Sequence, residues 1–109
     1  MNKIGNEIAI LNDYYGSLLT KLQSDTVRLY YDRDMSMCEI ASEQGITRMA
    51  VKMSLDNAAK KLRNYEDKLS LCKLSGSILR ELYDLRDKPH EIDEMRIKLD
   101  KIIALVEEL

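Results

Sequence analysis

The chain has 109 residues, of which 45% are hydrophobic and 33% charged, so it carries enough apolar side chains for one domain with its own core. With only 4 Gly and 1 Pro, it has too few turn-forming residues for an all-β domain. Its net charge of -2 argues, taken as an average, against nucleic acid as a partner.

Other classes of protein are disfavoured by what the sequence lacks. The longest uncharged stretch, 14–20, is far shorter than the roughly 20 residues of a membrane span, and no signal-peptide core follows Met1. We therefore expect a cytoplasmic protein with Cys38 and Cys72 as free thiols. A single histidine, His90, and no Gly-rich phosphate loop predict no enzyme, no metal and no cofactor.

The first half of the chain predicts two helices before the most informative segment. Apolar residues recur every three or four positions over residues 3–19, which indicates an amphipathic helix. Thr20 and Gln23 form a capping-box pattern, so a second helix is expected to begin there. The polar residues 32–34 are expected to end it as a turn.

A further capping-box pattern, Ser36 with Glu39, opens a short third helix. Gly45 follows this helix and suits the left-handed turn with which many helices end. Thr47 is then positioned to cap a long helix of about 22 residues, which keeps one apolar side as far as Leu69.

Residues 36–61 together match a helix-turn-helix. Ala41 is small where the two helices would cross, and Gly45 supplies the reversed turn. Ile46 and Val51 would fill the small core between the helices. A plain helical hairpin also needs small residues and a glycine, and it stays open as the alternative.

The average charge hides a basic segment. Residues 1–46 have a net charge of -3, residues 47–73 have +4, and residues 74–109 have -3. The basic segment coincides with the long helix of the motif, which restores nucleic acid as a candidate partner.

If the long helix enters a major groove, its first turns face bases and its later turns face phosphates. The expected nucleic-acid-binding residues are Thr47, Arg48, Met49, Lys52, Met53, Lys60 and Lys61. Of these, Arg48 and Lys52 can donate to guanine or phosphate. Met49 and Met53 offer no hydrogen bonds, and Asp56 repels phosphate. An adaptable protein-binding surface, or partial burial of both methionines beside the first helices, therefore also stays open.

Residues 71–109 predict two more helices, separated at Pro89. Whether the first of them continues the helix 47–69 is left open. The last helix has apolar residues at unbroken steps of three and four, namely Ile92, Met95, Leu99, Ile102, Val106 and Leu109. We expect an antiparallel helical pair over 72–109 that contributes to a homodimer, and we expect 1–70 and 71–109 to form one compact unit.

Several stretches carry a resemblance to a known family. They are residues 14–20, 23, 29–32, 36, 39–41, 45–48, 50–51, 62, 65–66 and 68–69. In this order they resemble the YlxM-type family of small DNA-binding proteins, which is itself similar to region four of sigma factors. The resemblance covers somewhat over half of the chain, from Leu11 to about Leu71.

The resemblance implies an all-α bacterial protein with a sigma region-four-like helix-turn-helix, of the winged-helix-like DNA-binding class without a wing, plus a C-terminal helical pair. It also implies a regulatory role connected, through gene neighbourhood, with the signal recognition particle pathway. The chain departs from the family pattern within the motif. Met49 stands where Gln is usual, and Met53 and Ser54 stand where Asp and Asn are usual. The scaffold is thus expected to carry over better than its base specificity.

Two functions follow from these patterns. The first is a DNA-binding regulator that uses the helix-turn-helix and the basic segment. The second is a protein-interaction adaptor on the same scaffold without sequence-specific DNA binding; its support is the methionine pair, Asp56 and the acidic flanks. Components of the signal recognition particle are candidate partners for either function.

Overall fold

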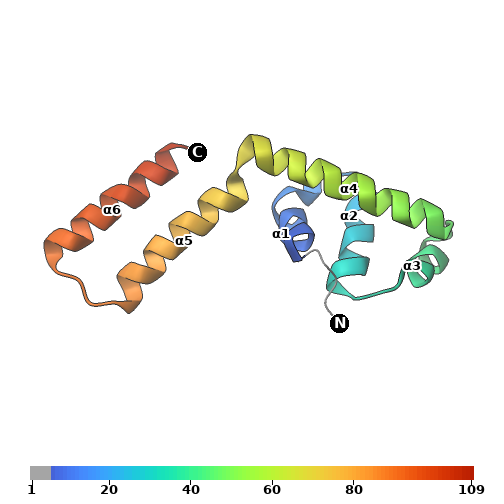
Figure 1. Ribbon diagram of the computed structural model, residues 1–109, viewed down its shortest axis with the longest axis horizontal. Coiled ribbons are helices and arrows are strands. Elements are labelled where there is room, and N and C mark those ends of the chain that lie inside the picture. The colour runs from blue at the N-terminus through green and yellow to red at the C-terminus, as the bar shows by residue number, and fades with distance from the viewer. Residues whose placement is uncertain (1–5) are drawn as a thin grey trace. The chain divides into compact units, whose positions relative to one another are not determined.

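The computed structural model describes residues 6–109 and confirms the expected all-α fold (Figure 1). Within these residues there are six α-helices and no strand: α1 Asn6–Tyr15, α2 Lys21–Val27, α3 Met37–Gln44, α4 Arg48–Leu69, α5 Leu71–Asp87 and α6 Ile92–Glu107. A 3-10 helix spans Gly16–Leu18 and a π-helical turn spans Arg28–Asp32. No helix among the described residues is long and apolar enough to cross a membrane.

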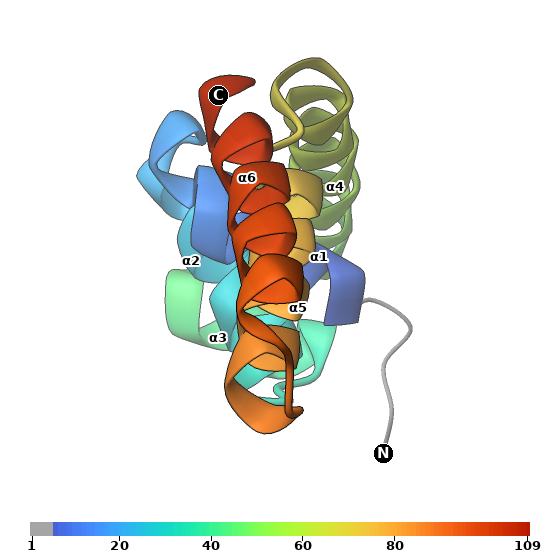
Figure 2. The ribbon, with the colours of Figure 1, turned by 90° about the vertical axis from the view of Figure 1, so that its left-hand side faces the viewer.

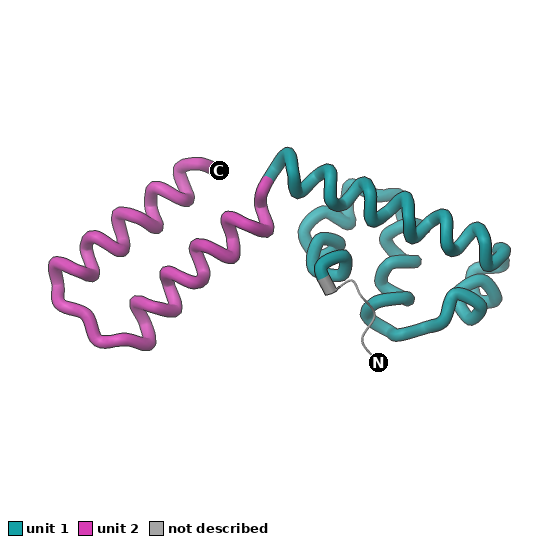
Figure 3. The backbone as a smooth tube through the Cα atoms, viewed as in Figure 1, with its two compact units in different colours: residues 1–69 teal, residues 70–109 magenta. Residues whose placement is uncertain are grey.

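The chain divides into two compact units, residues 1–69 and residues 70–109 (Figure 3). Ser70 lies between them with φ of 54°, in the left-handed region that residues with a Cβ rarely adopt. This backbone reversal makes α4 and α5 two separate helices, which the sequence had left open. The expectation that both parts pack as one compact unit stays a prediction.

The first helix is shorter than its apolar periodicity predicts. The expected range was 3–19, of which 3–5 lie outside the described residues, but α1 ends at Tyr15. At Gly16 a Cβ would lie 2.7 Å from Asn12 Oδ1 and 2.9 Å from Ser24 Oγ. Both polar side chains are buried, and the Ser24 hydroxyl donates to Asn12 Oδ1 at 3.2 Å. The turn at Gly16 therefore closes tightly on α2, and Leu18, although in phase with the helix, is 54% exposed.

The second helix begins as predicted. The Gln23 N–H donates to Thr20 Oγ1 at 3.2 Å and the Thr20 N–H donates to Gln23 Oε1 at 3.3 Å, which completes the capping box. α2 is regular only to Val27 and continues as the π-helical turn. The chain then reverses at Asp34, whose φ is 53°.

The long helix α4 is the spine of the first unit and crosses α1, α2 and α3 (Figure 1). Its buried row is Val51, Leu55, Ala58 and Leu62. Opposite this row lie the buried apolar side chains of the other helices, including Ile8, Leu11, Tyr15, Val27 and Ile40. The Tyr15 hydroxyl donates to Glu66 Oε1 at 2.5 Å, which ties α1 to the second half of α4.

The second unit is the expected antiparallel pair, with α5 and α6 side by side in Figure 1 and α6 in front of α5 in Figure 2. Only part of the apolar seam predicted for the last helix packs against α5. Ile102 is buried against α5, whereas the remaining seam positions are exposed. The row of α6 that meets α5 contains Lys98, Ile102 and Leu105, because Lys98 is drawn inward by its 2.7 Å ion pair with Asp84 of α5.

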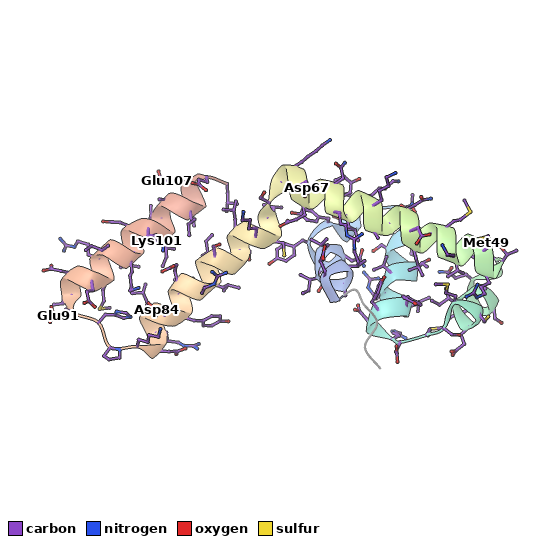
Figure 4. All side chains as sticks on the ribbon, viewed as in Figure 1. Met49, Asp67, Asp84, Glu91, Lys101 and Glu107 are labelled. Carbon is purple, nitrogen blue, oxygen red and sulfur yellow. The ribbon has the colours of Figure 1, made fainter. Side chains whose placement is uncertain are left out.

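The two faces of this hairpin differ in chemistry. One face is charged: it carries Lys101, which pairs with Glu81 at 3.0 Å next to the inward Lys98–Asp84 pair (Asp84 and Lys101 are labelled in Figure 4). On each helix, the residue that directly follows an inward-facing residue lies about 100° further around the axis. Because α5 and α6 run antiparallel, these following residues of both helices point to the same side of the hairpin, its second face. This second face is apolar and consists of Leu79, Leu82, Leu99, Ile103 and Val106, each between 42% and 53% exposed.

Candidate nucleic-acid interface

The turn between α3 and α4 is built by backbone and capping hydrogen bonds. The Glu39 N–H donates to Ser36 Oγ at 3.1 Å and the Ser36 N–H donates to Glu39 Oε1 at 3.2 Å, so the predicted capping box is present. Gly45 has φ of 69° and ends α3, and the Ile46 N–H donates to the Ala41 carbonyl at 3.0 Å. A side chain with Cβ is strained at this φ, which explains the glycine.

The beginning of α4 is fixed from both sides. The Ala50 N–H donates to Thr47 Oγ1 at 3.0 Å, so Thr47 is the predicted cap. Ile40 and Val51 are fully buried and Ala41 is nearly so, while Ile46 is half-buried. The first turns of α4 therefore stand on a closed core and a capped end, which holds their outward side chains in one direction.

The outward side chains of the first two turns are those that the sequence proposed as a reading surface. Thr47, Arg48, Met49, Lys52 and Met53 are all exposed. Met49 is 62% exposed and Met53 57%, so the hypothesis that they are partly buried beside the first helices is wrong. The reason is their spacing, because each lies two residues from buried Val51, about 200° around the helix.

The basic residues of α4 do not form one continuous basic face. The Lys52 ammonium pairs with Asp56 Oδ2 at 2.9 Å, and Arg63 Nε lies 3.5 Å from Glu7 Oε1. Lys60 and Lys61 are both exposed, but consecutive helical residues diverge by about 100°. The structure therefore separates the two lysines from each other. Lys60, seven residues after Met53, lies on the same side of α4 as Met49 and Met53, whereas Lys61 points to a different side.

Two of these pairings were not part of the sequence-based interpretation. Lys52 and Asp56 are four residues apart, a spacing at which opposite charges on a helix meet, so the sequence held the signal. The partners Glu7 and Arg63 lie on different helices and no local pattern joins them. Glu39 is also exposed on α3, so the surface around the motif holds charges of both signs.

Comparison with known proteins places the motif in a family. The family model described as "Putative helix-turn-helix protein, YlxM / p13 like" matches residues 2–103. The chain belongs to this family, UPF0122. It is 35% identical to the UPF0122 protein of Desulforamulus reducens over 95% of this chain and 97% of that protein. It is 38% identical to the one from Clostridium acetobutylicum over 87% of each chain, and 33% identical to the one from Fusobacterium nucleatum over 89% of each.

The family match confirms that the chain belongs to a helix-turn-helix family, which favours a helix-turn-helix over a plain helical hairpin. The bounds 36–61 of the motif stay a prediction. It also agrees with the resemblance to YlxM-type proteins that the sequence carries. The curated UPF0122 relatives come from bacteria.

Proposed function

We propose that this UPF0122 protein is a cytoplasmic DNA-binding regulator that inserts the first turns of α4 into a major groove. The observation that carries the proposal is the capped, core-supported start of α4, from which Arg48 and Lys52 project into solvent. Binding rather than catalysis is the proposed activity, because the motif presents donors for bases and phosphates and no pairing of nucleophile with base.

The test is a salt titration of binding to a fluorescent duplex DNA, measured by anisotropy. Arg48→Ala and Lys52→Ala are each expected to weaken binding, and a lost phosphate contact lowers the slope of log K against log salt by about 1. Lys68→Ala is the matched control, since Lys68 lies on the same helix about 24 Å beyond Lys52. Binding that ignores both changes, or responds equally to the control, contradicts the proposal.

Asp56 supplies a second test in the opposite direction. Its carboxylate pairs with Lys52 and lies on the same exposed side of α4 as Met49. Asp56→Asn removes one negative charge and releases the Lys52 ammonium, so duplex binding is expected to tighten several-fold at low salt. Unchanged or weaker binding by Asp56→Asn would show that this side of α4 does not face DNA.

The alternative is a protein-interaction adaptor on the same scaffold. Exposed Met49 and Met53 favour it, because methionine adapts to varied apolar surfaces, and exposed Glu39 on α3 adds a negative charge to the motif. Duplex binding that is insensitive to Arg48→Ala and Lys52→Ala favours this adaptor over the DNA-binding regulator.

We further propose that the regulated process is the signal recognition particle pathway, on the support of the family resemblance alone. The same titration with the signal recognition RNA as the probe tests it. Binding to this RNA that exceeds binding to duplex DNA at equal salt indicates direct participation in the particle. Equally weak binding to both probes removes this part of the proposal.

We also propose that the apolar face of the second unit joins two copies of the chain. Only Ile102 is buried in this 40-residue unit, and chains of about this size usually need oligomerisation or another constraint to be stable. A face about 24 Å long and about two helices wide covers about 500 Å² per copy. Two such faces bury about 1,000 Å², the lower limit for a specific interface, and complete a four-helix bundle about a two-fold axis.

Sedimentation over a range of concentrations tests the homodimer. Leu82→Glu and Ile103→Glu place charges on the apolar face and are expected to shift the protein to monomer. Ile97→Glu is the matched control, because Ile97 is exposed on α6 but points away from this face. A wild-type mass that stays monomeric at every concentration removes the dimer, and a dimer that survives both face variants places the contact elsewhere.

A further inference from the structure

We infer that Met49 and Met53 are specificity-determining residues that select the 5-methyl groups of thymine in the major groove. The inference rests on the DNA binding proposed above and adds to it the chemical class of base edge that α4 reads. Neither methionine can read bases through hydrogen bonds, so the inference gives these two side chains a role through apolar contact.

The two methionines form one patch on the outward surface of the first two turns of α4. They are four residues apart, so they lie one above the other at a spacing of about 5–6 Å. Both lie opposite fully buried Val51, and they are 62% and 57% exposed (Met49 is labelled at the beginning of α4 in Figure 4). A groove that admits this end of α4 therefore meets the two thioethers first.

The polar neighbours of this patch are partly engaged within the protein. The Thr47 hydroxyl accepts the Ala50 N–H at 3.0 Å as the helix cap. The Lys52 ammonium pairs with Asp56 at 2.9 Å. In the first two turns of α4, the main contact with base edges is therefore apolar and comes from the two methionines. Arg48 is the neighbouring hydrogen-bond donor.

The major groove offers one apolar group for such contact. Every base pair presents hydrogen-bond donors or acceptors there, and thymine adds the C5-methyl group. A methionine pressed against a donor or acceptor strips it of water and returns no hydrogen bond, which costs binding free energy. Against a methyl group the same methionine buries apolar surface on both partners, so thymine is favoured at each contact.

The spacing of the patch sets the spacing of the methyl groups. A separation of about 5–6 Å between the two side chains spans fewer than two base-pair steps of about 3.4 Å each. The selected sites thus carry methyl groups on adjacent or next-adjacent base pairs. Each contacted methyl group is expected to tighten binding about fourfold, the value of one buried CH₂ group.

The experiment compares duplexes that differ only in the C5-methyl group. Alternating poly(dA–dT) is compared with poly(dA–dU), and poly(dG–dC) with its 5-methylcytosine counterpart, by competition for the full-length protein at low salt. The wild type is expected to prefer the methylated member of each pair. The ratio should fall toward one in the double variant Met49→Gln with Met53→Gln, in which Gln keeps the length and the helix propensity of Met.

A matched variant and separate outcomes keep the inference distinct from the function on which it rests. Met95→Gln changes a partly exposed methionine of α6 and should keep both ratios. If no duplex binds, the DNA-binding proposal fails and the inference fails with it. If duplexes bind with ratios of one, or with ratios that persist in the double variant, DNA binding stands and the inference is overturned. A preference in the dA-containing pair alone also overturns it, because groove shape rather than the methyl group then explains the ratio.

Discussion

Among the described residues, the first unit buries eleven apolar side chains, whereas the second unit buries only Ile102. The first unit closes this core with α4, which contacts three other helices. The second unit holds its two helices with Ile102, half-buried neighbours and the ion pairs of Asp84 and Glu81. A rigid core thus supports the candidate reading surface, while the hairpin keeps an apolar face available for a partner.

The largest difference between the two units is expected from truncation of their cores. Leu62→Ala removes a fully buried side chain at the centre of α4 and should cost about 2–5 kcal/mol of unfolding free energy. Ile102→Ala should cost less, because its neighbours are half exposed and can close around the gap. Urea unfolding of the full chain, followed by circular dichroism, measures the loss of unfolding free energy in each variant. Equal losses would contradict the difference in core packing between the two units.

Glycine replacement sharpens the same contrast with opposite signs. Gly16→Ala forces a Cβ against buried Asn12 and Ser24, so a loss of about 1–3 kcal/mol is expected. Gly76→Ala in α5 meets no atom within 4 Å and should stabilise the helix by about 0.4–1 kcal/mol. The midpoints of thermal unfolding report the two signs, and a stabilised Gly16→Ala protein would show that the polar pair can move aside.

A side chain at Gly45 would strain the backbone but would not clash with any neighbouring atom. The φ of 69° is unfavourable for a residue with Cβ, yet no atom lies within 4 Å of the added group. Gly45→Ala should therefore cost about 1 kcal/mol, and Gly45→Asn less, because Asn tolerates the left-handed region. Thermal unfolding ranks the three proteins, and an Ala variant as stable as the wild type would contradict the assignment of strain.

Local patterns predicted most of the fold and only part of the candidate site. The capping boxes at Thr20 and Ser36, the turn at Gly45 and the cap at Thr47 depend on residues within four positions, which a sequence displays directly. The end of α1 was missed because it depends on Asn12 and Ser24 meeting across the turn at Gly16, a contact between two helices.

The site itself depends on which way each side chain points. Exposure of Met49 and Met53 follows from burial of Val51, and only the closed core settles which side of α4 is inward. For α6, the sequence likewise did not show which side faces its neighbour. Apolar residues occupy more of the surface of α6 than α5 can cover, so only some of the predicted seam is buried. The row that turns inward is the one that contains buried Ile102 and Lys98, the partner of Asp84.

The smallest expected effect concerns the acid stability of the hairpin. Hydrogen bonds from Lys98 and then Lys88 lower the pKa of Asp84 to about 2, from 3.8 for a free aspartate. The unfolded chain therefore takes up this proton more readily between the two values. The contribution of Asp84 is present above about pH 4 and is lost as the pH falls toward 2.

Asp84→Asn should accordingly be less stable than the wild type near neutral pH, with a difference that shrinks toward about pH 2. The effect is small because Lys88 is solvent-exposed and water screens its charge. Asp100→Asn removes an exposed carboxylate in the interior of α6 that has no ion pair among the described residues. It is the control, and its difference in stability from the wild type should stay nearly constant over the same pH range. Urea unfolding at several pH values measures the difference. A difference that stays constant down to about pH 2 would mean that Asp84 holds the hairpin through packing rather than through its charge.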